Sequence, residues 1–345
     1  MAISFSGAKN YKKHNGLPAS VKVKKTIASP VHFYPLSQNG GIVLTPAVQT
    51  GDYILCGQKI ADFDSFEAVP VISSVSGRVV SVTEDMITVE NDMFYDECPY
   101  VPPTKSFDEL TMREIMWIMR ESGIYETGSG IPAHVLLSEA KLPEYAIVRC
   151  FDSDPYVSSQ QAAAYGNAEK VLLGLHAAFR VLGIRKAIIA VQNDVMKTYY
   201  DFKYHLRYNN DISLYCLKAR YPQSQDDILI KTLTGKSDTN AVILSAETLV
   251  NIADALTTGR PVTKKIVTVS GDDILSPDNF NVPLGATMIS LLESAGYTAP
   301  QVVFEGGVVT GNKVEDLDTP VGVCTSSLVA FDDIKNIPAY RKELI

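Results

Sequence analysis

Cysteine is scarce in this 345-residue chain, and its few thiols lie far apart in the sequence. They are Cys56, Cys98, Cys150, Cys216 and Cys324. Iron–sulfur clusters need grouped thiolates, and no two of these cysteines form a C-x-x-C pair, so we expect no iron–sulfur cluster on the chain. An odd number of scattered cysteines is typical of reduced thiols and predicts a cytoplasmic protein. The histidines lack zinc-site spacing, so no metal site is predicted.

The sequence also lacks any run approaching the roughly twenty apolar residues that span a bilayer, so any membrane association is expected to be peripheral. It has no excess of positive charge, because the formal net charge is −8, which argues against nucleic acid as the main partner. Lysines do gather between residues 9 and 25, without the apolar core of a signal peptide. We expect residues 1–30 to be a mobile basic arm, or alternatively a dock for an acidic partner.

The length exceeds what one hydrophobic core usually supports, so two or three domains are expected. Residues 31–105 contain alternating apolar positions and Gly-Asp and Ser-Gly turns, which predict half-buried strands. Within residues 106–258, predicted strands alternate with predicted helices, as in a Rossmann-like domain. The predicted strands are 145–149, 186–192, 211–218 and 241–245. The predicted helices include 111–123, which opens with a capping box, and 158–182, which Gly183 closes.

A short glycine loop follows the first of these helices. It reads Gly128-Ser129-Gly130-Ile131-Pro132-Ala133-His134. Glycine permits a phosphate and a flat ring to approach the backbone closely, and loop amides before a helix can bind the phosphate. The alternative is an ordinary turn after a helix, with Pro132 starting the next segment.

An acidic turn comes about twenty residues later, directly after the strand 145–149. It reads Asp152-Ser153-Asp154-Pro155-Tyr156. The carboxyl ends of strands in open α/β sheets are where ligands bind, so both carboxylates are candidate ligand contacts. The alternative is an Asx turn before Pro155, which the same residues satisfy.

Taken in order, these motifs resemble the RnfC (RsxC) family of electron-transport complex subunits, which includes the cobalamin reductase PduS and proline-reductase-associated relatives. The glycine loop is similar to the family's "GGAGFPTH" and the acidic turn to its "ECEPY". Tyr34-Pro35-Leu36-Ser37-Gln38 resembles "PLSQH", with Asn39 in place of the histidine, and residues 51–60 and 73–79 resemble "GDxVxxGQxI" and "SSVSGxV". Residues 221–235 resemble "YPQGAExxLIxxLTG", and residues 259–345 resemble an SLBB module.

The resemblance implies an α/β multidomain protein. Its parts would be a lipoyl-like barrel-sandwich hammerhead at 31–105, a Rossmann-like domain similar to the complex I flavin subunit at 106–258, and an SLBB β-grasp domain with a C-terminal tail at 259–345. It implies FMN as cofactor and NADH as a substrate. The implied cofactor-binding residues are Gly128, Ser129, Gly130, Pro132, His134, Arg149, Asp152, Asp154 and Tyr156.

The chain departs from the family pattern at several of these positions. Tyr125-Glu126-Thr127 replaces "GLG", and a carboxylate at Glu126 would repel a phosphate. Leu136 replaces a lysine that would bind the phosphate, and Arg149 replaces an asparagine and offers a cation instead. Full-length relatives carry cluster motifs after the SLBB module, so we expect another chain to take the electrons.

The resemblance therefore predicts an RnfC-like electron-transfer protein that passes electrons between NADH or a protein donor and a partner redox chain through FMN. The alternative is a cofactor-free assembly subunit of a redox complex that keeps the fold without the flavin. A third possibility is an accessory electron carrier of an anaerobic reductase. In each case the expected partners are redox subunits, with at most peripheral attachment at the inner face of a membrane.

Overall fold

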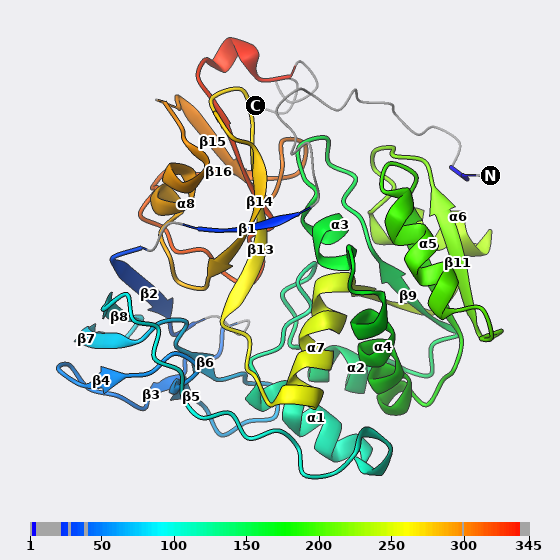
Figure 1. Ribbon diagram of the computed structural model, residues 1–345, viewed down its shortest axis with the longest axis horizontal. Helices are drawn as coiled ribbons and strands as arrows, with labels where there is room; N and C mark the ends of the chain where they lie inside the picture. Colours follow the sequence, from blue (N-terminus) through cyan, green and yellow to red (C-terminus); the bar gives the residue numbers. More distant parts are fainter. Residues whose placement is uncertain (1, 5–21, 27–28, 38–40, 299, 339–345) are drawn as a thin grey trace.

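The computed structural model describes residues 2–4, 22–26, 29–37, 41–298 and 300–338, and these form three lobes, each with its own sheet or pair of sheets (Figure 1). Gln38 and Asn39 of the predicted "PLSQH" motif, and the lysines between residues 9 and 21, lie outside the described residues. In Figure 1 the first lobe is blue to cyan, the second mainly green, and the third orange to red.

The first lobe is a barrel-sandwich of two small sheets. One sheet has the order β2-β8-β7-β4 and the other β3-β5-β6. The strands are β2 Val31–Pro35, β3 Thr45–Pro46, β4 Tyr53–Ile54, β5 Lys59–Asp62, β6 Val71–Ile72, β7 Gly77–Val82 and β8 Met86–Asn91. Alternate residues of β7 and β8 point into a shared apolar core, as the alternating sequence pattern predicts. Gly77 is required where it stands, because a Cβ there would lie 1.9 Å from the carbonyl oxygen of Glu90.

The second lobe is a four-stranded parallel sheet in the order β11-β10-β9-β12, with helices on both faces. Its strands are β9 Tyr145–Arg149, β10 Ala187–Gln192, β11 Ile212–Leu217 and β12 Ala241–Ser245. Its helices are α1 Met112–Glu121, α2 Ala133–Glu139, α3 Ser159–Ala164, α4 Ala168–Leu182, α5 Met196–His205, α6 Asp226–Thr234 and α7 Ala246–Thr258. The four predicted strands and the capping box at Thr111 are confirmed. This is the Rossmann-like architecture that the alternating pattern predicts.

The prediction of one helix over 158–182 is wrong, because the structure has two helices there. Gly166 has a positive φ of 72°, which ends α3, and Asn167 stands at the N-cap of α4. An apolar pattern continues across the break because both helices pack on the same core, and this continuity concealed the turn.

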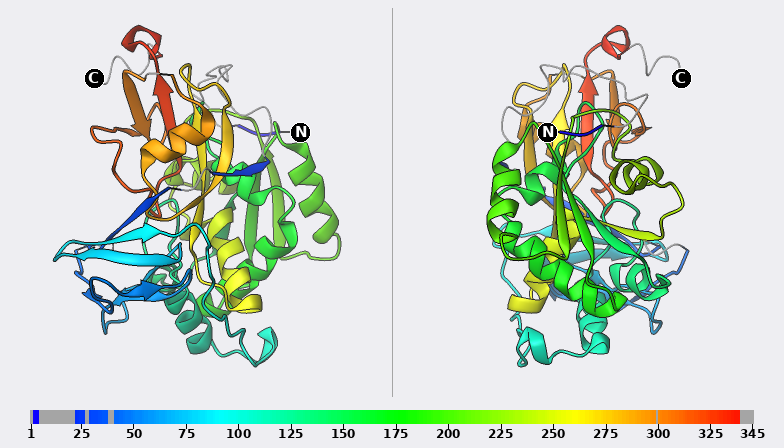
Figure 2. Two further views of the ribbon diagram at one scale, coloured as in Figure 1. Left: turned by 60° about the vertical axis from the view of Figure 1, so that its left-hand side comes forward. Right: turned by 90° about the vertical axis from the view of Figure 1, so that its right-hand side faces the viewer.

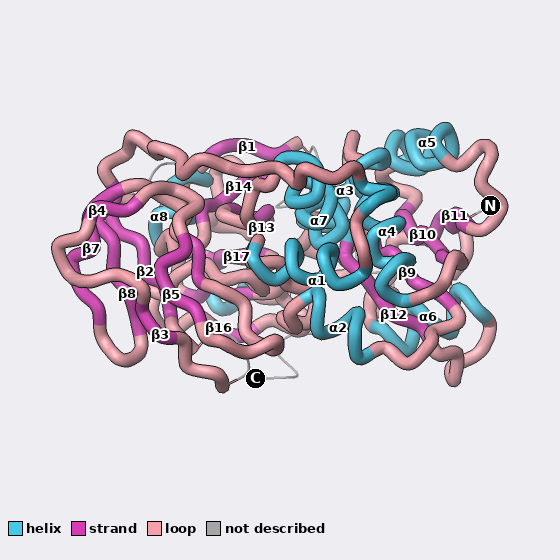
Figure 3. Tube along the Cα trace, turned by 90° about the horizontal axis from the view of Figure 1, so that it is seen from below, coloured by secondary structure: helices cyan, strands magenta, loops and turns pink. Residues whose placement is uncertain are grey.

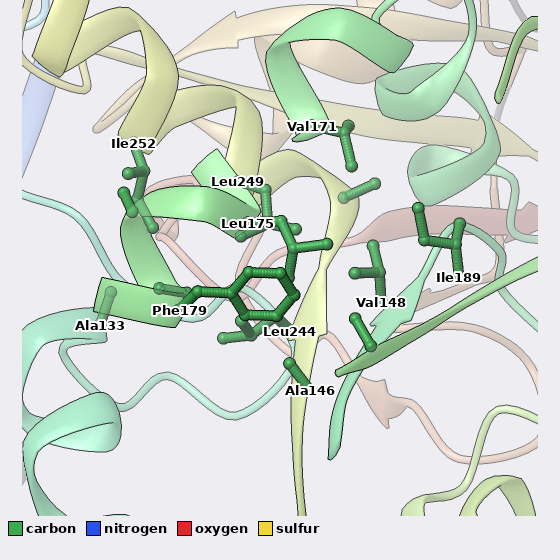
Figure 4. Packing of buried hydrophobic residues seen from close by; sticks show 14 of the residues in the cluster. Ala133, Ala146, Val148, Val171, Leu175, Phe179, Ile189, Leu244, Leu249 and Ile252 are labelled. Carbon is green, nitrogen blue, oxygen red and sulfur yellow. The ribbon is translucent and has the colours of Figure 1, made fainter. Parts of the chain in front are cut away.

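The main core lies between the sheet and helices α4 and α7 (Figure 4). Val148, Ile189 and Leu244 of the sheet pack toward Leu175 of α4 and Leu249 of α7. Helices α4 and α7 approach each other very closely at Gly174, where a Cβ would lie 2.1 Å from the carbonyl oxygen of Leu249. The helices therefore form a fixed layer behind the strands, and α7 begins directly at the end of β12.

The third lobe is a mixed sheet in the order β1-β14-β13-β17-β15-β16. Its elements are β13 Lys264–Ser270, β14 Asp278–Pro283, α8 Met288–Ala295, β15 Val302–Glu305, β16 Asn312–Lys313 and β17 Ser327–Phe331. The first and last of these strands, β13 and β17, lie side by side and parallel, and α8 packs on the sheet through Leu291 and Leu292, as in a β-grasp.

One part of the basic segment belongs to this third sheet. Residues Val23–Lys25 form β1, which pairs in parallel with β14, and Lys24 is ion-paired to Asp278 at 2.6 Å. The prediction that residues 1–30 form a mobile basic arm is therefore wrong for β1, because a three-residue strand at a sheet edge has no sequence signal of its own. Seen from below, the strands of the first lobe lie at the left, and the parallel sheet with α4, α5 and α6 lies at the right (Figure 3).

A buried ion pair joins the central and third lobes, which lie against each other in both views of Figure 2. Lys265 at the start of β13 reaches Glu247 in the first turn of α7 at 2.8 Å, and their side chains are only 3% and 6% exposed. The second carboxylate oxygen of Glu247 accepts the Ile266 N–H at 2.7 Å. Helix α7 is thereby fixed to β13 as well as to its own sheet.

Removing one partner of this pair leaves the other charge buried and uncompensated. We expect Lys265→Met to lower the free energy of unfolding by about 3 kcal/mol, and the double change Lys265→Met with Glu247→Gln to recover much of that loss. Urea denaturation followed by circular dichroism measures both. The control is Lys170→Met, which breaks the exposed pair between Lys170 and Asp254 and should cost less than about 1 kcal/mol. Equal losses for the two lysine variants would contradict this account.

Candidate functional site

The order of the central sheet creates a crevice at one point of its carboxyl edge. From β9 the chain continues to β10 on one side, while β12 returns on the other side. Ligands of open α/β sheets bind outside the strand ends at such a switch point. Arg149 ends β9 and Ser245 ends β12, and the two residues are direct partners in the ladder. A cavity of about 300 Å³ lies here.

Four of the predicted site residues line this cavity. They are Gly128, Arg149, Asp152 and Asp154. The fold therefore brings the glycine loop and the acidic turn together, although the loop lies between α1 and α2 and the turn follows β9. The other predicted residues, Ser129, Gly130, Pro132, His134 and Tyr156, are not among those that line it.

The glycine loop is organised by the side chain of Glu126, which is 2% exposed. Its carboxylate accepts the Ser245 N–H at 2.9 Å and the Gly128 N–H at 3.1 Å, and it also accepts the Ser245 hydroxyl. Its backbone carbonyl accepts the Gly130 N–H at 2.7 Å. The loop is thus closed on itself, and a buried carboxylate lies at the N-terminus of α7, where the helix dipole favours negative charge.

Arg149 extends from the end of β9 across the mouth of the loop. One guanidinium nitrogen, Nη2, would lie 2.0 Å from a Cβ on Gly128, so the space that glycine leaves open contains this side chain. The same nitrogen lies 4.0 Å from Glu126 and donates to the Ser245 hydroxyl at 3.3 Å. The other, Nη1, donates to the Ser224 carbonyl and the Asp226 carboxylate, both at 3.0 Å. The cation is therefore held between Glu126 and Asp226.

Asp152 supports the start of α3. Its carboxylate accepts the Gln160 N–H at 2.8 Å and the Ser159 hydroxyl at 3.3 Å, so it fulfils a capping role for the helix. Loss of hydration raises the pKa of the Asp152 carboxyl above its usual range, although the Gln160 N–H and the nearby Arg149 charge oppose that effect. Only part of this carboxylate is available to a ligand in the cavity.

Asp154 joins the acidic turn to the third lobe. Its carboxylate accepts the Tyr156 N–H at 3.1 Å and the Val309 N–H at 2.8 Å. Gly307, at φ 104°, permits this contact, because a Cβ there would lie 2.5 Å from the carboxylate. The first contact is the local turn bond that the Asx-turn alternative predicts, and the second is a contact between domains.

The remaining predicted residues have structural surroundings. Gly130, at φ 72°, faces Cys324 of the third lobe, whose Sγ would lie 2.7 Å from a Cβ. Pro132 is the N-cap residue of α2, and the exposed Ser129 accepts the Ile131 N–H at 3.4 Å.

Two aromatic residues from the motifs are buried away from the cavity. His134 is fully buried, and its Nε2 lies 2.6 Å from the carbonyl oxygen of Phe66 in the first lobe. Burial lowers the pKa of His134, so the ring is neutral near pH 7. Tyr156 packs edge-on against Phe331 at 5.7 Å, and its carbonyl accepts the Ser270 hydroxyl. Neither ring is placed to stack on a ligand in the cavity.

Sequence reasoning missed Ser245 and Gln160, which also line the cavity. Ser245 lies at the carboxyl end of a strand that the sequence does predict, so its position could have been inferred once β12 was placed beside β9. Gln160 had no such signal, because its Oε1 accepts the Glu247 N–H at 3.2 Å through a contact 87 residues distant in sequence.

The residues present fit one end of FMN. Three features that favour phosphate binding meet at the loop: the Arg149 guanidinium, the N-terminus of α7 and Gly128, which has no side chain. The ring end fits less well, because Asp154 and Tyr156 are engaged in protein contacts. Among the described residues, no group of three or more His, Cys, Asp or Glu side chains is arranged to hold a metal ion.

Two family models match the chain. Residues 119–258 match the Nuo51 FMN-binding domain, and residues 4–98 match the RnfC barrel-sandwich hybrid domain. The second match agrees with the first lobe, and the first with the central lobe from α1 to α7. The expected barrel-sandwich and flavin-subunit folds are thereby confirmed.

Known relatives match over most of the chain. A subunit of the proton-translocating ferredoxin:NAD(+) oxidoreductase complex from Clostridium ljungdahlii is 27% identical over 87% of this chain and 70% of its own length. The counterpart from the Na(+)-translocating complex of Acetobacterium woodii is 26% identical over 86% and 72%. A subunit of the ion-translocating oxidoreductase complex from Haemophilus influenzae is 24% identical over 87% of this chain, which spans half of that relative.

A structural comparison agrees on the fold. A crystal structure of an NAD+-reducing [NiFe]-hydrogenase in the air-oxidized state superposes with a TM-score of 0.55 and 15% identity, over 90% of this chain and 70% of that one. In the part of the chain that the structure describes, no helix is long and apolar enough to cross a membrane. The two domain matches and the relatives together show that this chain resembles the RnfC family over most of its length.

Proposed function

We propose that this chain is an electron-transfer subunit of a redox complex and that its central domain takes FMN in the switch-point cavity. The observation that carries the proposal is the convergence of Gly128, Arg149 and the N-terminus of α7 on that cavity, within a domain that matches FMN-binding domains. The relatives are subunits of ferredoxin:NAD(+) oxidoreductase complexes, which supports NADH as a donor or product and other redox subunits as partners. Attachment to a membrane would then be peripheral and through those partners.

The residues around the cavity have defined roles in this proposal. Gly128 would give the phosphate room beside the backbone once the Arg149 guanidinium, which fills that space, turns to pair with it. The Ser245 N–H would then hold the phosphate in place of Glu126. Asp152 and Asp154 form the opposite wall and keep it rigid through α3 and the third lobe. Bound FMN would supply the redox chemistry, and the protein would position it and exclude water.

The alternative function is a cofactor-free assembly subunit, and one observation favours it. Arg149 and Glu126 occupy the phosphate end of the cavity with an internal pair of opposite charges. The backbone amides of residues 127–130 each donate to a protein oxygen already. Such a subunit would use the same three lobes for docking alone.

A direct binding measurement separates the two functions. Protein purified without denaturant and mixed with FMN should quench flavin fluorescence and gain thermal stability, because a ligand that binds only the folded state stabilises it. At a free FMN concentration of about 100 times Kd, linkage adds about 2.7 kcal/mol to the free energy of unfolding. A protein that neither quenches nor melts higher at saturating FMN favours the assembly subunit.

The loop position is tested by Gly128→Ala. The added methyl group meets the Arg149 guanidinium at 2.0 Å and a Glu126 carboxylate oxygen at 3.2 Å. The guanidinium is the end of a long side chain and can move, so the variant should fold, but the methyl would fill the space of close phosphate approach. We expect FMN affinity to fall about tenfold, as for a modest overpacking of about 1–3 kcal/mol. Ser129→Ala, at the exposed neighbouring residue, is the matched control and should bind as the wild type does. An unchanged Kd for Gly128→Ala would show that FMN does not contact this loop.

A further inference from the structure

Two backbone donors and one cation converge on one buried carboxylate at the switch point. The Ser245 N–H at the N-terminus of α7 and the Gly128 N–H of the loop donate to Glu126 at 2.9 and 3.1 Å. The Arg149 guanidinium lies 4.0 Å from the same carboxylate. Phosphate sites in proteins commonly combine these three kinds of group: an amide at a helix N-terminus, the amide of a loop glycine and a guanidinium.

The convergence is built into the fold rather than lying on its surface. Glu126 is 2% exposed, and Ser245 is fully buried. A further amide of α7, that of Glu247, is also satisfied internally, by Gln160 at 3.2 Å. A phosphate that entered the cavity at the loop would therefore find its amides already bonded and a negative charge at contact distance.

We propose that Glu126 is an internal anion that occupies the phosphate position of the cavity and competes with phosphate-bearing ligands for Gly128, Ser245 and Arg149. This inference rests on the proposed function for its natural ligand, FMN, but the competition itself applies to any phosphate. Two like charges sharing one donor set repel each other strongly in a site from which water is excluded. Binding then requires the Glu126 carboxylate to leave its donors or to be neutralised.

Arg149 is the second residue that affects the competition between Glu126 and a phosphate. While Glu126 is charged, the Arg149 guanidinium remains between Glu126 and Asp226 and fills the space beside the Gly128 Cα. The Asp226 side chain is 68% exposed, so solvent screens its electrostatic attraction for Arg149. The attraction of Glu126 is screened less, because Glu126 is buried. Neutralising Glu126 should therefore free Arg149 to pair with a phosphate.

The test uses the full chain and the near-isosteric variant Glu126→Gln, which keeps an oxygen for Ser245 while removing the charge. Thermal unfolding is measured in inorganic phosphate and in chloride at equal ionic strength, and FMN is titrated by fluorescence quenching. We expect phosphate to raise the melting temperature of Glu126→Gln and not of the wild type, and FMN to bind the variant about tenfold more tightly. The matched control is Glu139→Gln, at an exposed glutamate on α2, which should behave as the wild type does.

Further variants identify the group that takes the phosphate. Arg149→Gln added to Glu126→Gln should reverse most of the gain, because it removes the cation that the ligand would pair with. Should the amide variant not fold, Glu126→Ala replaces it, because the vacated space can admit water or phosphate to the Ser245 and Gly128 amides; this variant should also gain phosphate stabilisation.

The outcomes separate this inference from the proposed function. Phosphate stabilisation of Glu126→Gln without FMN binding supports the internal anion and overturns FMN as the ligand. Equal FMN affinity in the wild type and in Glu126→Gln, with no phosphate effect in either, overturns the internal anion and leaves FMN standing. No response of either the wild type or the variants to phosphate or FMN overturns both.

Discussion

The junction between the acidic turn and the third lobe is the constraint on which the rest of the structure depends. Asp154 accepts an N–H from Val309, Gly307 has no side chain so that this contact can form, and the Tyr156 carbonyl accepts the Ser270 hydroxyl. Lys265 and Glu247 add a buried charge pair beside it. The turn after β9 therefore holds two domains together, and any ligand role must be compatible with that task. Because a buried polar group without a partner costs free energy, these residues cannot be released singly.

This constraint explains why the polar groups around the cavity are hydrogen-bonded to one another. At the strand ends, buried donors need acceptors whether or not a ligand is bound. Glu126 and Gln160 provide them at α7, and Asp152 does so at α3. The glycine loop thus has a stable conformation of its own, which makes it both an ordinary turn and a candidate phosphate site. The two interpretations of the loop that the sequence allows describe one geometry with different occupants.

Much of the fold could be predicted because its signals are local. The parallel strands are short apolar runs, the helix after Thr111 starts with a capping box, and Gly183 ends α4 with a positive φ. The strand-end rule placed the acidic turn at a ligand site, and the family resemblance implied that the glycine loop meets it there. The partners of the site residues could not be predicted, since they come from contacts such as that of Asp154 with Val309, 155 residues away. For the same reason His134 could not be recognised as a contact to the first lobe.

Arg149 links the domain fold to the chemistry of the cavity. At the position where the resembling family has asparagine, this longer side chain can reach both Ser245 beside it and Asp226 on α6. A cation in that position compensates the lysine that Leu136 replaces, but only if no internal carboxylate neutralises it. Glu126 supplies such a carboxylate, and so the two departures from the family pattern balance each other in charge. If the cavity takes a phosphate as proposed, this balance would make its affinity depend on the single buried carboxylate of Glu126.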